Sequence, residues 1–258
     1  MLLVIDVGNT NTVLGVFDEK NLIHSWRIRS DKNMTEDEFN VLVSSLFNER
    51  KLDITGFRGT IISCVVPRMM MILNAFCLKY MHHPPIWVDA STVSSIMPIL
   101  YSNPSEVGAD RIVNAIAAYS RYKAALIVID FGTATTFDVI SRKGEYLGGA
   151  ISPGIMISSD ALFLNASKLP RVEIFSPPDK VIGKDTAESM KSGIIFGYAG
   201  LVDGMVARIK KELDEKPLII ATGGLAPLMN HVSESIEHVD SSLTLEGLRI
   251  IYDHLHDK

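Results

Sequence analysis

Residues 126–140 read LIVIDFGTATTFDVI, and this stretch places an aspartate, a glycine and three threonines where an apolar run ends. A similar stretch, VIDVGNTNTVLGVF, occupies residues 4–17. A shift of 124 positions (130 − 6) superposes Asp6 on Asp130, Gly8 on Gly132 and Thr12 on Thr136. The repeat predicts two matching halves, which we set at residues 1–115 and 116–258.

Each copy joins a strand to a loop suited to phosphate. The β-branched residues predict a buried strand, Asp-X-Gly predicts a turn, and the second apolar run predicts a returning strand. Glycine allows a tight bend and lets a ligand approach the backbone, whose N–H groups and neighbouring hydroxyls can surround phosphate oxygens. Because aspartate would repel phosphate, Asp6 and Asp130 are expected to hold a hydrated cation. The hydroxyls belong to Thr10, Thr12, Thr133, Thr135 and Thr136.

A plain hairpin is the alternative reading of each loop. In a hairpin the aspartate caps the turn and Gly-Asn supplies a positive φ. A hairpin does not need a repeated Asp-X-Gly-X-X-X-Thr pattern, whereas a phosphate held between two loops does. The repeat therefore favours nucleotide chemistry.

Composition narrows the class of partner. The 258 residues carry a net charge of −5 with scattered Lys and Arg, so no basic stripe is present to neutralise nucleic-acid phosphates or anionic lipid. The first residues, MLLVIDV, are too short for a signal sequence, and no apolar run approaches the ~18 residues of a membrane span. We therefore expect a cytoplasmic protein with a small-molecule ligand, and Cys64 and Cys77 are expected to be buried thiols.

The first half reads as three antiparallel strands, then helix, strand, helix and strand. Thr35 with Glu38 forms a predicted capping box, and the apolar stripe after it predicts a helix that ends near Arg50. The predicted strands are residues 2–7, 11–17, 22–28, 59–66 and 85–88, and a helix over 68–81 opens with a methionine cluster expected to fill core. A further helix is expected to start near Val107.

The second half repeats this order. Strands are predicted over 126–140 in two runs and over 145–152, 218–221 and 236–239, with helices over 156–168, 185–213 and 243–256. In the long helix Gly193, Gly197, Gly200 and Gly204 fall on one face, which is typical of close approach by another backbone. The neighbour could be the other half, a second subunit or a nucleotide. The Gly223-Gly224 turn could admit a flat ligand or simply join strand to helix.

Five strings carry a family resemblance: DVGNTNT, YSNPSEVGADR, VIDFGTATTFD, GGAISPGI and ATGGLA, spread between positions 6 and 226. With the two βββαβαβα halves they resemble type III pantothenate kinase, within the acetate kinase, hexokinase, heat-shock protein and actin superfamily. The resemblance implies an α/β fold of two duplicated ribonuclease H-like halves with a nucleotide cleft between them. It also implies ATP-dependent phosphorylation of pantothenate, the first step of coenzyme A synthesis, by a homodimer.

The resemblance also assigns residues. Asp110 matches the family's proton acceptor, and Asp130 matches the ligand of a monovalent cation, K⁺ or NH₄⁺. Thr133 matches an ATP contact, and Mg²⁺ is expected with the ATP. The first ATP loop corresponds to Asp6, Val7, Gly8, Asn9, Thr10, Asn11, Thr12 and Val13, and some members carry a lysine where this chain has Val13. The pantothenate site corresponds to Tyr101, Gly108, Ala109, Asp110, Arg111 and Thr186, and Gly223 and Gly224 match the adenosine-side turn loosely.

The residues themselves leave alternatives beside these roles. Phosphoryl transfer needs positioning, charge neutralisation and a carboxylate near the attacking hydroxyl, which Asp110 could supply. In the first turn of a helix, Asp110 could equally stabilise the helix dipole. Arg111 could bind a carboxylate in bidentate fashion or form a surface ion pair. Two rival functions are a non-catalytic nucleotide-binding regulator and a phosphatase of the exopolyphosphatase type.

Overall fold

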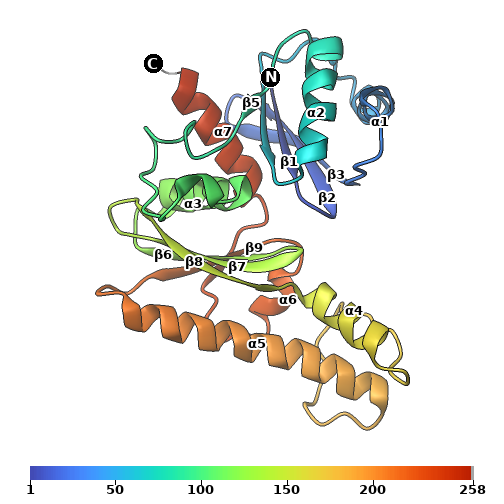
Figure 1. Ribbon diagram of the computed structural model, residues 1–258, viewed down its shortest axis with the longest axis vertical. Helices are drawn as coiled ribbons and strands as arrows, with labels where there is room; N and C mark the ends of the chain where they lie inside the picture. The colour runs from blue at the N-terminus through green and yellow to red at the C-terminus, as the bar shows by residue number, and fades with distance from the viewer. Residues whose placement is uncertain (257–258) are drawn as a thin grey trace. The chain divides into compact units, whose positions relative to one another are not determined.

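The N-terminal strands form the antiparallel meander that the sequence predicts, and a parallel extension completes the first sheet (Figure 1). Its order is β3-β2-β1-β4-β5, with β4 and β5 parallel to β1. The strands are β1 (Leu2–Val7), β2 (Asn11–Asp18), β3 (Asn21–Arg29), β4 (Thr60–Cys64) and β5 (Ile86–Trp87). The helices are α1 (Glu36–Glu49), α2 (Pro67–Phe76) with a π-helical turn Cys77–Met81, and α3 (Ala109–Tyr122) after a 3₁₀ turn Pro104–Glu106.

The second sheet repeats this topology. Its order, β10-β9-β6-β7-β8, again flanks the first strand of the repeat with an antiparallel second strand and a parallel fourth strand. The strands are β6 (Leu126–Phe131), β7 (Ala134–Ile140), β8 (Tyr146–Pro153), β9 (Leu218–Thr222) and β10 (His238–Val239). The helices are α4 (Ile155–Asn165), α5 (Thr186–Glu212), α6 (Ala226–Asn230) and α7 (Leu243–His256). The predicted duplication of an α/β half is confirmed.

The computed structural model describes residues 1–256 and divides into two units, each with its own core. Unit 1 comprises residues 1–117 together with α7, and unit 2 comprises residues 118–242. The division at 117/118 lies near the expected boundary at 115/116. The chain after residue 242, however, was expected in the second half and instead belongs to unit 1.

Packing explains why α7 joins the first sheet. One face of that sheet carries Leu3, Ile5 and Val7, which pack in the core with α1 and α2. The other face of β1 and β2 packs against α7. An added Cβ at Gly15 of β2 would lie 2.8 Å from Val4 of β1 and 3.1 Å from Leu245 of α7. Figure 1 shows α7 and the pair α1 and α2 on opposite sides of the strands.

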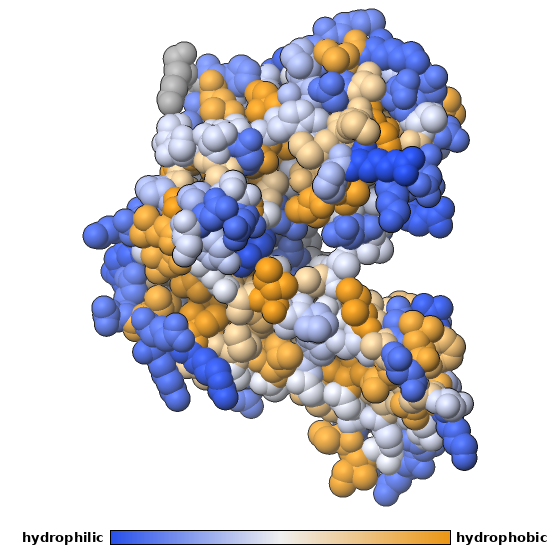
Figure 2. All heavy atoms as spheres, in the orientation of Figure 1, coloured by the Kyte–Doolittle hydropathy of each residue, from blue (hydrophilic) through white to orange (hydrophobic). Residues whose placement is uncertain are grey.

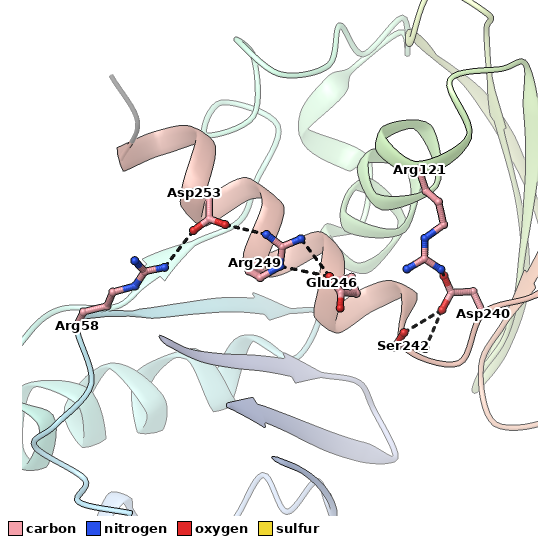
Figure 3. Close-up of polar contacts among 7 residues, drawn as sticks. All are labelled: Arg58, Arg121, Asp240, Ser242, Glu246, Arg249 and Asp253. Carbon is pink, nitrogen blue, oxygen red and sulfur yellow. Dashed lines mark hydrogen bonds and ion pairs between the residues drawn. The ribbon is translucent and has the colours of Figure 1, made fainter. Parts of the chain in front are cut away.

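Polar contacts hold α7 in unit 1 as well. The Thr244 hydroxyl donates to the Asn114 amide oxygen of α3 at 2.7 Å, and Tyr252 donates to the Arg58 carbonyl at 3.2 Å. Along the helix, Arg249 forms ion pairs with both Glu246 and Asp253. Asp253 also forms an ion pair with Arg58 (Figure 3).

The core of unit 2 lies between its sheet and α5. Ile195, Val202 and Val206 of α5 are buried with residues of β6 and β9. By length and composition α5 could cross a membrane, and 39% of its most apolar window is buried here. The core helix of a folded protein meets the same criterion, so α5 is weak evidence for a span.

Two local predictions need correction. Only Met69 of the methionine cluster is buried, whereas Met70 and Met71 are 37% and 73% exposed. The periodicity of α2 turns a single side chain per turn toward the core. Cys77 is buried as predicted, and burial raises its pKa to about 12, but Cys64 is only partly buried at the end of β4. The capping box at Thr35 and Glu38 is confirmed.

At the start of α5, Asp185 and Glu188 form one half of a capping box. Asp185 caps the helix by accepting from the Glu188 N–H at 2.8 Å. The Glu188 carboxylate does not return to the cap residue and instead accepts from the Lys184 N–H at 2.8 Å. The helix Thr186–Glu212 begins and ends within one residue of the bounds that the sequence predicts.

Candidate functional site

The first loop is a short connection between β1 and β2. The Gly8 N–H donates to the Asn11 carbonyl at 3.0 Å and closes the loop, in which Asn9, Thr10 and Asn11 are exposed. Neither Gly8 nor Asn9 has a positive φ, so the plain-hairpin reading loses its expected backbone signature. An added Cβ at Gly8 would lie 3.2 Å from the Asn11 carbonyl oxygen, so the tight turn itself favours glycine at this position.

Two of the threonines proposed to surround phosphate face inward instead. Thr12 is fully buried, and its hydroxyl lies 2.8 Å from the Ser30 hydroxyl. Thr135 is also fully buried, and its hydroxyl has no hydrogen-bond partner among the described residues. Alternation along β2 and β7 turns these side chains into the protein. Thr10 and Thr133, by contrast, are exposed at the loops.

The structure brings Asp110 to the same end of the first sheet as the Asp6 loop. Val65, directly after β4, donates its N–H to the Val7 carbonyl at 3.1 Å. The Val65 side chain would lie 3.7 Å from a Cβ at Gly108, and the same Cβ would lie 2.6 Å from the Asp110 carboxylate. Because β1 and β4 are parallel, their carboxyl ends meet at one edge, and the α3 N-terminus lies against that edge.

The environment of Asp110 suits a general base. Burial raises the pKa of Asp110 above its ordinary value, and the Arg111 N–H, which donates to its carboxylate at 2.8 Å, opposes the shift. The side chain remains partly exposed, so a ligand can reach it. A Cβ at Gly108 would lie 2.6 Å from the present position of the Asp110 carboxylate, so a larger residue there would displace that side chain.

The other residues expected at the pantothenate site fall into two groups. Ala109 and Arg111 are buried in the first turn of α3, 8% and 7% exposed, and Tyr101 is partly exposed before the 3₁₀ turn. Thr186 lies in unit 2, exposed at the first position of α5.

The second loop is built around Asp130, near the end of β6. Asp130 pairs with Thr136 of β7 and Thr222 of β9, so the three side chains share one face of the sheet. Gly223 has a φ of +92°, and an added Cβ would lie 2.5 Å from the Asp130 carboxylate. The Gly-Gly turn, which sequence matched only loosely to an adenosine contact, thus lies directly against Asp130.

Sequence reasoning missed a buried carboxylate on the neighbouring strand, β7. Asp138 is fully buried and accepts from the Tyr146 hydroxyl at 2.6 Å and from the Thr136 hydroxyl at 3.0 Å. Its position two residues after Thr136, on the same face of β7, was the available signal. Asp138 therefore orients the Thr136 hydroxyl beside Asp130.

Metal binding at Asp130 would rest on one carboxylate. Across residues 1–256 no group of three or more His, Cys, Asp or Glu side chains is arranged to hold a metal ion. Partly exposed Asp130, with hydroxyls and backbone close by, offers the oxygen donors that a hard cation prefers. The residues therefore fit a weakly held cation better than a closed divalent site.

Solved structures with this architecture are actin-like in fold. The ethanolamine utilization protein EutJ from Carboxydothermus hydrogenoformans aligns with a TM-score of 0.58 at 16% identity, over 96% of this chain and 89% of that one. MreB 5 of Spiroplasma citri, bound to AMPPNP, aligns with a TM-score of 0.56 at 10% identity, over 99% and 97%. At these identities the likeness shows the fold alone.

Sequence relatives are far closer. A family model described as type III pantothenate kinase matches residues 2–208. A protein of that name from Desulfatibacillum aliphaticivorans is 68% identical over 253 residues, which cover 98% of both chains. Another from Desulforapulum autotrophicum is 62% identical over 253 residues, covering 98% of this chain and 97% of that one. Because the family model matches residues 2–208 and these relatives are 68% and 62% identical over nearly the whole chain, this chain belongs to the type III pantothenate kinase family.

Proposed function

We propose that this pantothenate kinase moves the γ-phosphoryl group of ATP to the primary hydroxyl of pantothenate with Asp110 as the base. The observation that carries the proposal is the partly exposed Asp110, with its raised pKa, at the sheet edge that also holds the Asp6 loop. A raised pKa makes a carboxylate a better proton acceptor near neutral pH. The product, 4'-phosphopantothenate, enters coenzyme A synthesis.

In this proposal, residues of both Asp-X-Gly loops contact ATP. The exposed backbone of Asn9, Thr10 and Asn11 offers N–H groups to phosphate oxygens, and Thr133 offers a second contact. Asp6 faces the Mg²⁺ that accompanies ATP, and the phosphates supply most of that ion's ligands. Arg111, beside Asp110, pairs with the pantothenate carboxylate and aims the hydroxyl at the base.

The direct test is ADP release in a coupled assay with and without pantothenate. A kinase releases ADP only when pantothenate is present. A nucleotide-binding regulator would release none in either case, and a phosphatase would release phosphate without pantothenate. Mass detection of phosphorylated pantothenate completes the test.

The cation at Asp130 gives a second expected result. Activity should depend on K⁺ or NH₄⁺ and be poor in Na⁺ alone, because one carboxylate with neutral oxygens suits a large, weakly hydrated cation. Steady-state rates in the three chloride salts at equal ionic strength measure this dependence. Asp130→Asn should remove the difference between salts, and equal rates in all three salts for the unaltered enzyme would remove the cation from the proposal.

The glycine face of α5 is the proposed contact with a second copy of the chain. An added Cβ at Gly193, Gly197, Gly200 or Gly204 would meet nothing within 4 Å, so the stripe does not pack closely inside unit 2. Beside it, α4 and α5 line a mostly apolar groove with a volume of about 740 Å³, and apolar side chains gather over this part of the unit (Figure 2). On α4, Leu164 is 76% exposed. A second copy would cover this surface.

Gly197→Leu tests that contact. The added side chain has room within the chain, so the variant should fold normally and dimerise more weakly, by the ~1 to 3 kcal/mol typical of overpacking. Sedimentation reports the dimer, and pantothenate titration reports whether Thr186, on the same helix, depends on it. Gly197→Ala is the smaller control, and a folded Leu variant that remains dimeric would exclude this face as the interface.

The thiols support a cytoplasmic setting. Cys64 and Cys77 are both free, and no disulfide links them. Burial raises the pKa of each thiol, which keeps it protonated and unreactive. Free, unreactive cysteines suit the reducing cytoplasm, to which we assign the enzyme.

A further inference from the structure

Ser30 follows β3 directly and reaches back to the loop between β1 and β2. Its N–H donates to the Thr10 carbonyl at 3.0 Å. Its hydroxyl donates to the Gly8 carbonyl at 2.7 Å and lies 2.8 Å from the Thr12 hydroxyl. One residue, distant in sequence, thus holds three different residues of the loop.

The direction of these bonds follows from the number of hydrogens. The single hydrogen of the Ser30 hydroxyl goes to the Gly8 carbonyl, so the Thr12 hydroxyl must donate to Ser30. The two hydrogen bonds, from Thr12 to Ser30 and from Ser30 to Gly8, strengthen one another and lie on the inner side of the loop. With the Gly8 and Thr10 carbonyls turned inward, the outer side of the loop presents fewer negative oxygens to an incoming phosphate.

The second loop has a matching brace at the equivalent place. Gly154 lies 124 positions after Ser30 (154 − 30) and directly follows β8, the third strand of its sheet. Its N–H donates to the Thr133 carbonyl at 3.1 Å. A Cβ at Gly154 would collide with the Thr133 and Gly132 carbonyls, so the brace there is made by backbone alone. Both units therefore fasten the loop after their first strand from the end of their third strand.

We propose that Ser30 is a positioning residue for ATP: it holds the Gly8 to Thr12 loop in the shape that binds the phosphates. The proposal rests on the assignment of this loop to ATP made above. Ser30 is only partly buried and acts through the loop. Loss of its hydroxyl would free the Gly8 carbonyl and the fully buried Thr12 hydroxyl together, and the loop would have to be reordered each time ATP binds.

The test compares three variants of the full chain. Ser30→Ala removes the hydroxyl, Ser30→Thr keeps it, and Ser25→Ala is the matched control at an exposed position of β3. For Ser30→Ala we expect kcat/KM for ATP to fall about 10-fold, as the loss of two hydrogen bonds would give, with KM for pantothenate unchanged. Ser30→Thr should restore most of the loss. ATP-dependent stabilisation in thermal melting should follow the same order.

The outcomes that overturn the inference differ from the outcome that defeats the proposed function. If Ser30→Ala behaves as Ser25→Ala, or melts at a lower temperature while KM for ATP is unchanged, Ser30 does not position the ATP loop. If KM for pantothenate rises instead, the loop does not bind ATP and its assignment fails too. If the unaltered enzyme releases no ADP in response to pantothenate, only the proposed function fails. The inference about Ser30 can still be tested, because thermal melting with ATP does not depend on phosphoryl transfer. Ser30→Cys keeps a weaker donor, so its kcat/KM for ATP should lie between those of the unaltered enzyme and Ser30→Ala. This variant serves as the test if Ser30→Ala does not fold.

Discussion

Asp110→Asn should lower the rate of phosphoryl transfer by about 10²-fold or more, the contribution typical of a general base. Asparagine keeps the size of the side chain and the oxygen that accepts from the Arg111 N–H, so both substrates should still bind. The loss should therefore appear in kcat, with KM for ATP and pantothenate little changed. Single-turnover kinetics with saturating substrates measure the transfer step directly.

The same variant should be more stable than the unaltered protein at neutral pH. Because burial raises the pKa of Asp110, the folded protein binds this proton more tightly than the unfolded chain. The stability from this group is present below the ordinary pKa of about 3.9 and is lost as the pH rises through the raised value. Asparagine cannot ionise, so the variant avoids that loss. Its free energy of unfolding in urea should exceed that of the unaltered protein most at neutral pH, and the difference should shrink toward pH ~4.

Glu106→Gln provides the matched control. Glu106 is an exposed acid in the 3₁₀ turn just before α3, and its carboxylate accepts from the Asn103 amide at 2.9 Å. It is not expected to touch either substrate, so its neutralisation should leave kcat unchanged. Full activity of Asp110→Asn would remove this residue from catalysis, and an equal loss in both variants would point to a general effect of charge.

Gly223→Ala should destabilise unit 2 by about 2 to 4 kcal/mol. Two causes act together at this position. The φ of +92° disfavours any side chain, and the new Cβ would lie 2.5 Å from the Asp130 carboxylate and 2.7 Å from the Phe131 backbone. Chemical denaturation measures the loss, and the dependence of activity on K⁺ should weaken because Asp130 is displaced.

Gly132→Ala separates crowding from the mere loss of a glycine. A Cβ at Gly132 would meet the Ala134 oxygen at 3.5 Å and the Asp130 carboxylate at 3.7 Å, which are ordinary contacts. This variant should therefore keep the stability of the unaltered protein. If Gly223→Ala is equally stable, the backbone at Gly223 can relax and the turn does not hold Asp130.

Local features of the chain were readable from its residues. The strand Leu2–Val7 and the helix Leu243–His256 have the predicted bounds, and the capping box at Thr35 forms as expected. These signals involve residues within a few positions of one another, so alternation, helical periodicity and cap chemistry suffice to predict them. The duplication was readable too, because each copy repeats the same Asp-X-Gly pattern after a strand.

Parts of the candidate site depend on contacts that local patterns do not encode. Asp110 and the Asp6 loop lie at one sheet edge because β1 and β4 are parallel neighbours, and Ser30 bonds Gly8 because β3 returns beside β2. Gly223 lies against Asp130 only because β9 pairs with β6 in register. Thr12 is a similar case. Its place after a glycine predicts a hydroxyl near the loop, but the sequence does not say whether that hydroxyl faces a phosphate or Ser30.

The family, the repeated α/β halves and the residues around which the chemistry is proposed could all be identified from the sequence. The tertiary structure decided that α7 completes unit 1 rather than the second half, and that Gly223 supports Asp130. An apolar helix face predicts burial but not the sheet that buries it, because hydrophobic attraction has no direction and many surfaces satisfy it. Strand pairing and register choose among those surfaces, and both are settled only when the whole chain packs.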